Sequence, residues 1–382
     1  MRSSSTALGT NHSHQPQQFL SASIILTLSL DSLTVLISVL PFNSLTLSCY
    51  LPRAPASMSK GQVFPRLSAL IRQIILIVLY SISFMVSWLS CRNLNKKTLQ
   101  ARNNGRSSRH RTDHKHVECN GKVSIIIAVK NEAKYLGKTI RNLESTTVDK
   151  SRVEIVLVDA GCKDNTFEVA RVSKGVIPIV EVKNNTPCGL SRGAAFNSGA
   201  EVASGDILLF LRADCTVPPG YDETLRRQLN GSSRTVMSAF RFDFDSPSST
   251  TLTNSMVTSL RIISTYQNIM SSICRLPRGS QALAVTSTTF RHNKYPNDLL
   301  LMEDVAFVDR LRNYCATVGG EITILEQCVR SSSDDIVTIG ALKSTLYSLM
   351  AFVSWYHIGL SEEFIHKWFY VRLPRALSFY KL

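Results

Sequence analysis

The stretch Gly205–Cys215, GDILLFLRADC, constrains the fold most, because a short apolar run is followed directly by an acidic residue. The run Ile207–Leu211 carries no charge and is bounded by Gly205 before it and by Pro218–Gly220 after it. Such a run is typical of a central strand in a parallel sheet whose two faces are both covered. Ligands of open α/β sheets bind just beyond the carboxyl ends of such strands. We therefore expect Asp214 to lie at a site of chemistry; the alternative is a residue that only caps the turn.

The residues before this stretch alternate between strand-like and helix-like segments. Two apolar runs, Val123–Val129 and Glu154–Asp159, read as buried strands, and Ile177–Val182 reads as a third. Helical spacing of apolar residues follows Asn131, and a further helix is predicted for 191–203. This order predicts an α/β fold with a mostly parallel central sheet, right-handed crossovers and helices on both faces.

The pattern changes after Tyr221. The segment Thr235–Asp245 alternates apolar and polar residues and predicts a half-exposed strand. Helical structure is predicted for 246–275, a short strand for Ala282–Thr286, and a helix that begins at Met302–Asp304.

The N-terminal part has a different composition. Its first residues are rich in Ser and Thr and contain an apolar run, Phe19–Phe42, which is typical of targeting segments. A second run, Ile74–Cys91, is uncharged and just long enough to cross a bilayer; the alternatives are a buried helix or part of a cleaved targeting segment. The predicted organisation is a targeting or disordered region (1–65), a membrane-anchor helix (66–92), a basic linker (93–120), the α/β domain (121–330) and C-terminal amphipathic helices (331–382).

The net charge of +15 is concentrated near the N-terminus, where Asp31 is the only acidic residue up to Thr112. A basic tail beside apolar segments favours anionic lipid or a targeting receptor as partner, not nucleic acid. Positive charge after the second apolar run predicts a membrane-associated protein whose catalytic domain faces the cytosol. The alternative is an organelle, plastid or mitochondrion, after removal of a transit segment. The 9 cysteines include no Cys-x-x-Cys pair, which argues against a zinc module and a disulfide framework.

Carboxylates follow several of the predicted elements. Asp159 and Asp214 end two strands, and Glu303 and Asp304 begin a helix. In a parallel sheet the two strand ends share one edge, which suits a nucleotide and a diphosphate-bound metal. A hard cation such as Mg²⁺ or Mn²⁺ needs few protein carboxylates when phosphate oxygens complete its shell. Adjacent helix positions diverge by about 100°, so we expect one of Glu303 and Asp304 to act as a base and the other to position it.

Several of these segments together resemble the family-2 glycosyltransferases, which have the GT-A nucleotide-diphospho-sugar transferase fold. The similarity covers Val123 to about Asn313 and is strongest to a bacterial subgroup described as selenodomain-associated transferases. Five motifs in the right order carry it: SIIIAVKNE (124–132), VDAGCKDNT (158–166), GLSRGAAFNSGAEVASGD (189–206), LLFLRADCTVPPGY (208–221) and LLLMEDVAFVDRLRN (299–313).

The resemblance implies an inverting enzyme that moves a hexosyl unit from a nucleotide-diphospho sugar, UDP- or GDP-linked, to an acceptor hydroxyl on a lipid or small metabolite. It implies Asp304 as catalytic base with Glu303 beside it, and Asp214 as ligand of Mg²⁺ or Mn²⁺. The nucleotide-sugar site that it implies consists of Ala128, Glu132, Asp159, Arg192, Asn197, Arg212 and Gln281. Simpler readings are open for three positions: Asp159 as a turn residue, Arg192 as a solvated helix residue and Glu303–Asp304 as a plain helix start.

The chain departs from the family pattern at the metal motif. Arg212-Ala213-Asp214 replaces the usual Asp-x-Asp, Ser280 replaces an Asp, and no Arg-Trp pair occurs near 330–335. A guanidinium cannot ligate a cation, although it can pair with diphosphate oxygens. The alternative function is therefore a catalytically impaired GT-A protein that binds a nucleotide sugar or a protein partner without turnover. A nucleotidyltransferase is disfavoured because no Gly-rich phosphate loop follows the first strand.

Overall fold

The computed structural model describes residues 70–85, 87, 121–183, 191–231, 234–245, 252–299 and 301–356. Contacts divide the chain into two units, residues 1–67 and 68–382, and every described residue belongs to the second. The predicted targeting region, the basic linker and residues 357–382 lie outside the described residues.

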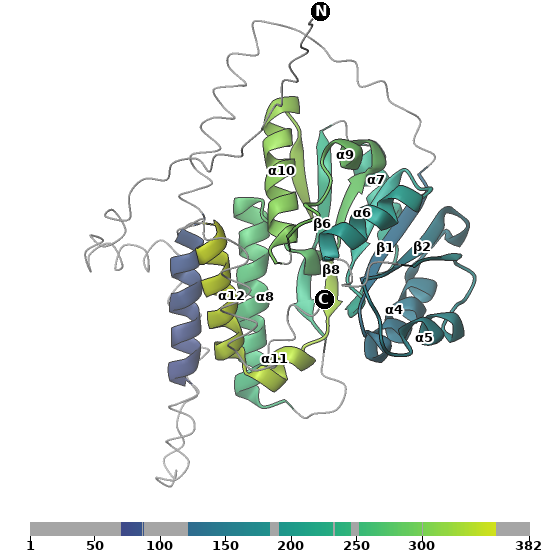
Figure 1. Cartoon of the computed structure of the whole chain (residues 1–382). Coiled ribbons are helices and arrows are strands. Elements are labelled where there is room, and N and C mark those ends of the chain that lie inside the picture. The colour runs from purple at the N-terminus through teal and green to yellow at the C-terminus, as the bar shows by residue number, and fades with distance from the viewer. Residues whose placement is uncertain are drawn as a thin grey trace, which may run out of the picture. The chain divides into compact units, whose positions relative to one another are not determined.

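An eight-stranded sheet forms the centre of the domain, in the order β3-β2-β1-β4-β7-β6-β8-β5 (Figure 1). Both β1 and β4 are almost completely buried, as their apolar sequences predicted. The strands are β1 (Val123–Val129), β2 (Val153–Asp159), β3 (Ile179–Val182), β4 (Ile207–Leu211), β5 (Cys215–Thr216), β6 (Thr235–Phe244), β7 (Leu283–Thr286) and β8 (Glu321–Ser331).

The sheet is mixed, which qualifies the prediction of a mostly parallel one. β3, β2, β1 and β4 are mutually parallel, as the alternation of strands and helices predicted. β7 runs antiparallel to β4 and to β6, and β5 runs antiparallel to β8, whereas β6 and β8 are parallel. The parallel half therefore brings the ends of β1, β2 and β4 to one edge of the sheet. The other half, formed by β7, β6, β8 and β5, contains both parallel and antiparallel pairs.

Helices cover both faces of the sheet and enclose two apolar cores. The side chains of successive β1 residues point to opposite faces, so Ile125 and Ile127 belong to one core and Ile126 to the other. The first core is closed by α4 (Ala133–Thr146), α5 (Thr166–Val172) and α7 (Tyr221–Gly231). The second is closed by α6 (Arg192–Val202), α8 (Asn254–Cys274), α9 (Ser287–His292) and α10 (Glu303–Val318). The predicted α/β architecture is confirmed.

A helix over 70–85 packs against α8 and α12 (Ala341–Tyr356), and α11 (Asp334–Ile339) precedes α12. Its inner face is held by two hydrogen bonds, Tyr80 Oη to Thr345 Oγ1 (2.9 Å) and Ser83 Oγ to Tyr266 Oη (2.7 Å). Within the part of the chain that the structure describes, no helix is long and apolar enough to cross a membrane. The spanning helix predicted for Ile74–Cys91 is therefore not found there; residues 86 and 88–91 of that segment lie outside the described ranges.

One buried carboxylate joins the edges of β1, β2 and β4, and we expect it to give stability that depends on pH. Glu154 accepts hydrogen bonds from Lys122 Nζ (2.8 Å), Ser124 Oγ (2.6 Å) and the backbone N–H of Ser204 (2.7 Å). Burial opposes ionisation, but these bonds outweigh it and lower the pKa of Glu154 to about 2. Because the folded pKa is depressed, the stabilisation is complete above the ordinary value of 4.5 and is lost as the pH falls toward 2. Glu154→Gln should lower the free energy of unfolding by about 1–3 kcal/mol at pH 7.

Urea unfolding of the wild-type protein and of Glu154→Gln at pH 7 and at pH 3 measures this effect. The difference between their free energies of unfolding should be smaller at pH 3 than at pH 7. Glu181→Gln is the control, because Glu181 forms a more exposed ion pair with Arg171 at 2.7 Å. Such pairs contribute about 0–1 kcal/mol. An equal loss for Glu154→Gln at both pH values would contradict the assignment of the pH dependence to this carboxylate.

Candidate active site

A partly open cavity of roughly 190 Å³ lies beyond the end of β4, where residues of α8, of α10 and of the ends of β6 and β8 line it. Five residues predicted from the sequence as functional line it together, although they come from three separate segments of the chain. They are Arg192 at the start of α6, Arg212 and Asp214 after β4, and Glu303 and Asp304 at the start of α10. The structure therefore brings together the charged residues of the candidate site.

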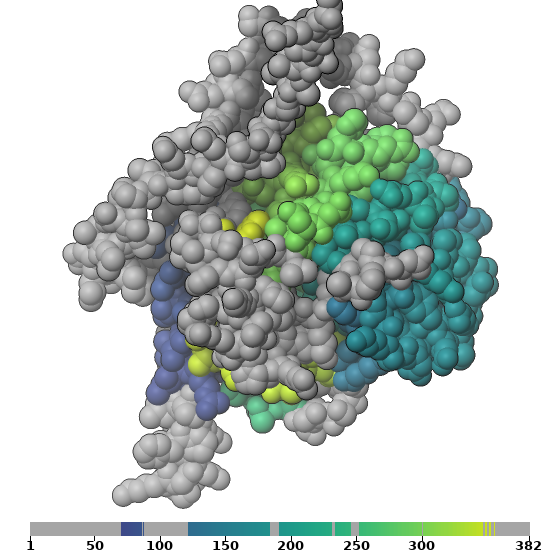
Figure 2. All heavy atoms as spheres, viewed as in Figure 1, coloured from purple at the N-terminus to yellow at the C-terminus, as the bar shows by residue number. Residues whose placement is uncertain are grey.

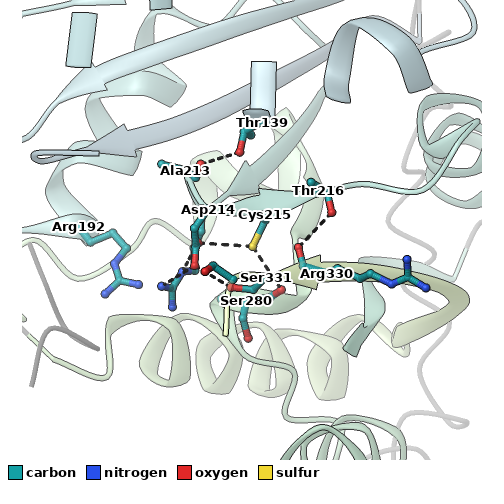
Figure 3. A network of polar contacts seen from close by, with 12 residues as sticks. Thr139, Arg192, Ala213, Asp214, Cys215, Thr216, Ser280, Arg330 and Ser331 are labelled. Carbon is teal, nitrogen blue, oxygen red and sulfur yellow. Dashed lines mark hydrogen bonds and ion pairs between the residues drawn. The ribbon is translucent and has the colours of Figure 1, made fainter. Parts of the chain in front are cut away.

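Asp214 is held by Arg212 and Ser331, and the Cys215 thiol makes a longer contact of 3.8 Å with its Oδ1. Arg212 donates to it twice, from Nε to Oδ1 (3.0 Å) and from Nη2 to Oδ2 (3.3 Å). Oδ2 also accepts a hydrogen bond from Ser331 Oγ (2.7 Å), which Figure 3 shows with Arg192 beside it. Ser331 ends β8, which pairs with β5 just after Asp214. The carboxylate is thus fixed between the turn after β4 and the second half of the sheet.

Arg192 and Glu303 form an ion pair with Nε and Oε1 3.1 Å apart. Ser191 caps α6 by accepting a hydrogen bond from the N–H of Ala194, which fixes where Arg192 begins the helix. Glu303 is 3% exposed. Burial raises the pKa of Glu303, and the charge of Asp304 adds to this, whereas Arg192 opposes it. Arg192 is therefore a paired residue of the cavity, and Glu303 is placed to orient its guanidinium.

Asp304 turns toward the loop before β7. Its Oδ2 accepts a hydrogen bond from the backbone N–H of Gly279 (2.8 Å), and its Oδ1 accepts one from Val305 at the start of α10 (2.8 Å). A Cβ atom at Gly279 would lie 3.5 Å from the Asp304 side chain, so the loop passes close to the carboxylate. Met302, which precedes the helix, has a left-handed backbone (φ 59°). This geometry holds the Asp304 carboxylate in a fixed position at the wall of the cavity.

The other predicted nucleotide-site residues do not line the cavity. Ala128 and Asp159 lie near the ends of β1 and β2, and Glu132 follows β1. Asp159 Oδ1 accepts hydrogen bonds from the N–H groups of Gly161 and Cys162, both at 2.8 Å, so it does form the turn that the simpler reading expected.

Asn197 and Gln281 have their polar atoms engaged inside the protein. Asn197 is 5% exposed, donates to Tyr295 O (2.9 Å) and accepts from Tyr295 N (3.0 Å). Gln281 is completely buried, donates to Phe240 O (2.8 Å) and accepts from Arg278 N (3.0 Å). Both side chains join backbone segments, so the structure gives them positioning roles and does not bring them to the cavity.

Sequence reasoning missed several residues that line the same cavity. Arg278 precedes Gly279, and its guanidinium lies 4.6 Å from the centre of the Phe352 ring. Gln267 of α8 donates to Ser280 Oγ (2.5 Å). Ser331 would have been found by the rule that strand ends carry functional residues, had β8 been predicted.

The donor set does not fit a metal site in the arrangement observed. Within the described ranges no group of three or more His, Cys, Asp or Glu side chains is placed to hold a metal ion. Each Asp214 oxygen accepts two contacts, and the nearest cation is the Arg212 guanidinium. A Mg²⁺ or Mn²⁺ ion would have to displace that guanidinium to reach the Asp214 carboxylate.

The sequence matches a known family over the part of the chain that carries Arg192, Arg212 and Asp214, whereas Glu303 and Asp304 lie beyond the match. Residues 124–282 match the model described as glycosyl transferase family 2. Glycosyltransferase AglE of Haloferax volcanii is 39% identical over 94 residues, which are 25% of this chain and 31% of that protein. An undecaprenyl-phosphate 4-deoxy-4-formamido-L-arabinose transferase of Pseudomonas savastanoi pv. phaseolicola is 36% identical over 100 residues, 25% of this chain and 29% of the relative. The chain thus spans about a third of the length of these relatives.

Solved structures of similar arrangement include a mannosyltransferase from Pyrobaculum calidifontis in complex with GDP-Man and Mn²⁺, with a TM-score of 0.46 and 15% identity over 73% of this chain and 72% of that one. Staphylococcus aureus TarS 1-349 has a TM-score of 0.42 and 17% identity over 68% of this chain and 74% of that one. The family match and the order of the strands confirm the predicted GT-A fold and support a glycosyltransferase of family 2. The narrower selenodomain-associated subgroup stays a prediction.

Proposed function

We propose that this protein is an inverting family-2 glycosyltransferase, which transfers a hexosyl unit from a UDP- or GDP-sugar to an acceptor hydroxyl with Asp304 as the base. The observation that carries the proposal is the meeting of Arg192, Arg212 and Asp304 at one cavity beyond the parallel strands. A glycosyl transfer needs positive charge at the diphosphate and one carboxylate at the acceptor. The cavity offers both.

In the proposed reaction the acceptor oxygen attacks the anomeric carbon of the donor sugar. The bond from that carbon to the diphosphate oxygen breaks, its electron pair leaves with the nucleoside diphosphate, and the acceptor proton passes to Asp304. Asp304 is suited to this because its carboxylate is held by the Gly279 N–H at 2.8 Å and still faces the cavity. One positioned base of this kind contributes about 10²- to 10⁴-fold in rate.

The leaving diphosphate needs charge neutralisation, which we assign to Arg212 and Arg192. Arg212 is already oriented by Asp214, and Arg192 by Glu303, so both guanidinium groups have fixed positions before the donor binds. Arginine forms two parallel hydrogen bonds with phosphate oxygens, and a preoriented donor loses little entropy on binding. Asp214 and Glu303 therefore act as positioning residues in this proposal.

The full-length protein incubated with a panel of UDP- and GDP-sugars should release nucleoside diphosphate from at least one of them. Release is measured by a coupled assay, and donor binding by calorimetry, each with and without Mn²⁺. Binding of a nucleotide sugar without release from any donor would contradict the enzyme and favour the alternative, a protein that binds the sugar nucleotide without turnover. Membrane association, predicted from the basic tail, is tested by fractionation of the native protein.

A further inference from the structure

The cavity has a second, apolar part that the transfer chemistry does not use. Aromatic and aliphatic side chains line it: Tyr80, Phe242, Phe244, Ile263, Tyr266 and Leu349. Tyr80 and Tyr266 stack with ring centres 4.0 Å apart, and Phe242 meets Phe244 edge to face at 4.8 Å. These residues come from the helix over 70–85, β6, α8 and α12, which lie together on the side of the domain away from β1 and β2 (Figure 1). These apolar side chains, which we call the apolar wall, therefore line the part of the cavity that lies away from β1 and β2.

Arg278 stands at the border between the two parts. Both Arg278 and its neighbour Gly279 line the cavity, and the Gly279 N–H donates to Asp304. The charge of Arg278 is also close enough to Tyr80 and Tyr266 to act on both. A ligand that touches the wall therefore has its polar end beside the proposed base and beside a fixed cation.

The helix that supplies Tyr80 has a second apolar face, which points away from the cavity. Leu76, Tyr80 and Ser83 are buried on the inner face at helical spacing. On the outer face a stripe at the same spacing is 41–51% exposed: Ile71, Ile74, Ile75, Val78 and Ile82. The chain continues into residues 92–115, which hold eight Lys or Arg residues and one acid. An apolar stripe next to a basic segment is the combination that binds anionic lipid surfaces.

We propose that the acceptor is an amphipathic lipid whose chain lies along the wall of Tyr80, Tyr266 and Leu349 and whose hydroxyl reaches Asp304. This inference rests on the proposed function and names the acceptor class for the same site. The helix over 70–85 then stands between the lipid surface and the cavity, with its outer stripe on the membrane and Tyr80 on the acceptor (Figure 2 shows this helix beside α12). A small polar acceptor would make no use of the six apolar side chains that line this part of the cavity.

The test measures binding of ethyl, hexyl and octyl β-glucosides to the full-length protein by calorimetry, below the concentrations at which they form micelles. Each methylene that enters the wall tightens binding about fourfold. With three of the added methylenes buried, the octyl compound should bind roughly 60-fold more tightly than the ethyl compound. Ile263→Ser should abolish most of this gain and leave ethyl glucoside binding unchanged. Ile273→Ser, on the same helix but 56% exposed, is the matched control and should keep the full gain.

Equal binding of the three compounds, or the same gain in Ile263→Ser, would overturn the proposal. The source of the acceptor is tested with octyl glucoside free in solution and with a glycolipid in vesicles that contain phosphatidylserine. The double variant Ile74→Asn/Val78→Asn should raise KM at least about tenfold for the vesicle-borne acceptor alone, and an unchanged KM would reject the membrane as source. Donor hydrolysis without any acceptor is measured in parallel. Chain-length-dependent binding without nucleotide release from any donor would contradict the proposed function and leave the lipid site standing.

Discussion

Asp304→Asn is expected to lower kcat about 10²- to 10⁴-fold and to leave the Kd for the nucleotide sugar within about twofold. Asparagine has the size of aspartate, and its amide oxygen can still accept the hydrogen bond from the Gly279 N–H. It cannot take the proton of the acceptor hydroxyl, so the loss should fall on the chemical step. Steady-state kinetics and calorimetry with the preferred donor separate the two effects.

Asp309→Asn is the control on the same helix, because Asp309 pairs with Arg312 at 3.2 Å on α10 and does not line the cavity. Glu303→Gln distinguishes the two adjacent acids. If Glu303 only orients Arg192, its replacement should raise KM for the donor more than it lowers kcat, since the ion pair of 3.1 Å is lost. Unchanged kcat in Asp304→Asn together with an inactive Glu303→Gln would move the role of base to Glu303.

The parallel half of the sheet could be predicted because its strands are continuous apolar runs. The strands β1, β2 and β4 were each predicted with bounds close to those observed. The alternation of strands with helices predicted correctly that they run parallel to one another. β8, Glu321–Ser331, was missed for a physical reason. It is buried only in part, and its pairing with β6 shifts register twice, so neither a continuous apolar run nor strict alternation marks it. Ser331, the Asp214 partner at its end, was missed with it.

The sequence predicted which charged residues line the cavity, but it did not predict which of them form ion pairs with one another. Arg192 and Glu303 are far apart in sequence, and only the packing of α6 near α10 makes them an ion pair. Asn197 and Gln281 show a role that the motifs did not indicate. Both belong to recognisable motifs, yet each satisfies buried backbone groups, a role that motif position alone does not reveal.

Arg212→Asp is expected to turn a reaction that does not depend on metal into one that does. In the wild-type protein the guanidinium pairs with Asp214. If it supplies the positive charge near the diphosphate, as we propose, EDTA should change kcat by less than about twofold. The substitution removes that charge and recreates the Asp-x-Asp spacing of the family, in which two carboxylates and phosphate oxygens can hold Mn²⁺. Without metal, kcat should fall at least about 10²-fold, as it does when a preorganised group at a developing charge is lost.

Addition of Mn²⁺ should then raise kcat of Arg212→Asp at least about tenfold. Addition of Mg²⁺ should raise kcat no further than Mn²⁺ does. Arg212→Lys is the matched control: it keeps the charge but loses the two-pronged contact with Asp214, 3.0 and 3.3 Å in length. It should lose part of the rate and gain no response to metal. Wild-type turnover that is abolished by EDTA and recovered with Mn²⁺ would show that the ion displaces Arg212 from Asp214. In that event the guanidinium has no place at the leaving group, and the charge there has to come from the metal and Arg192.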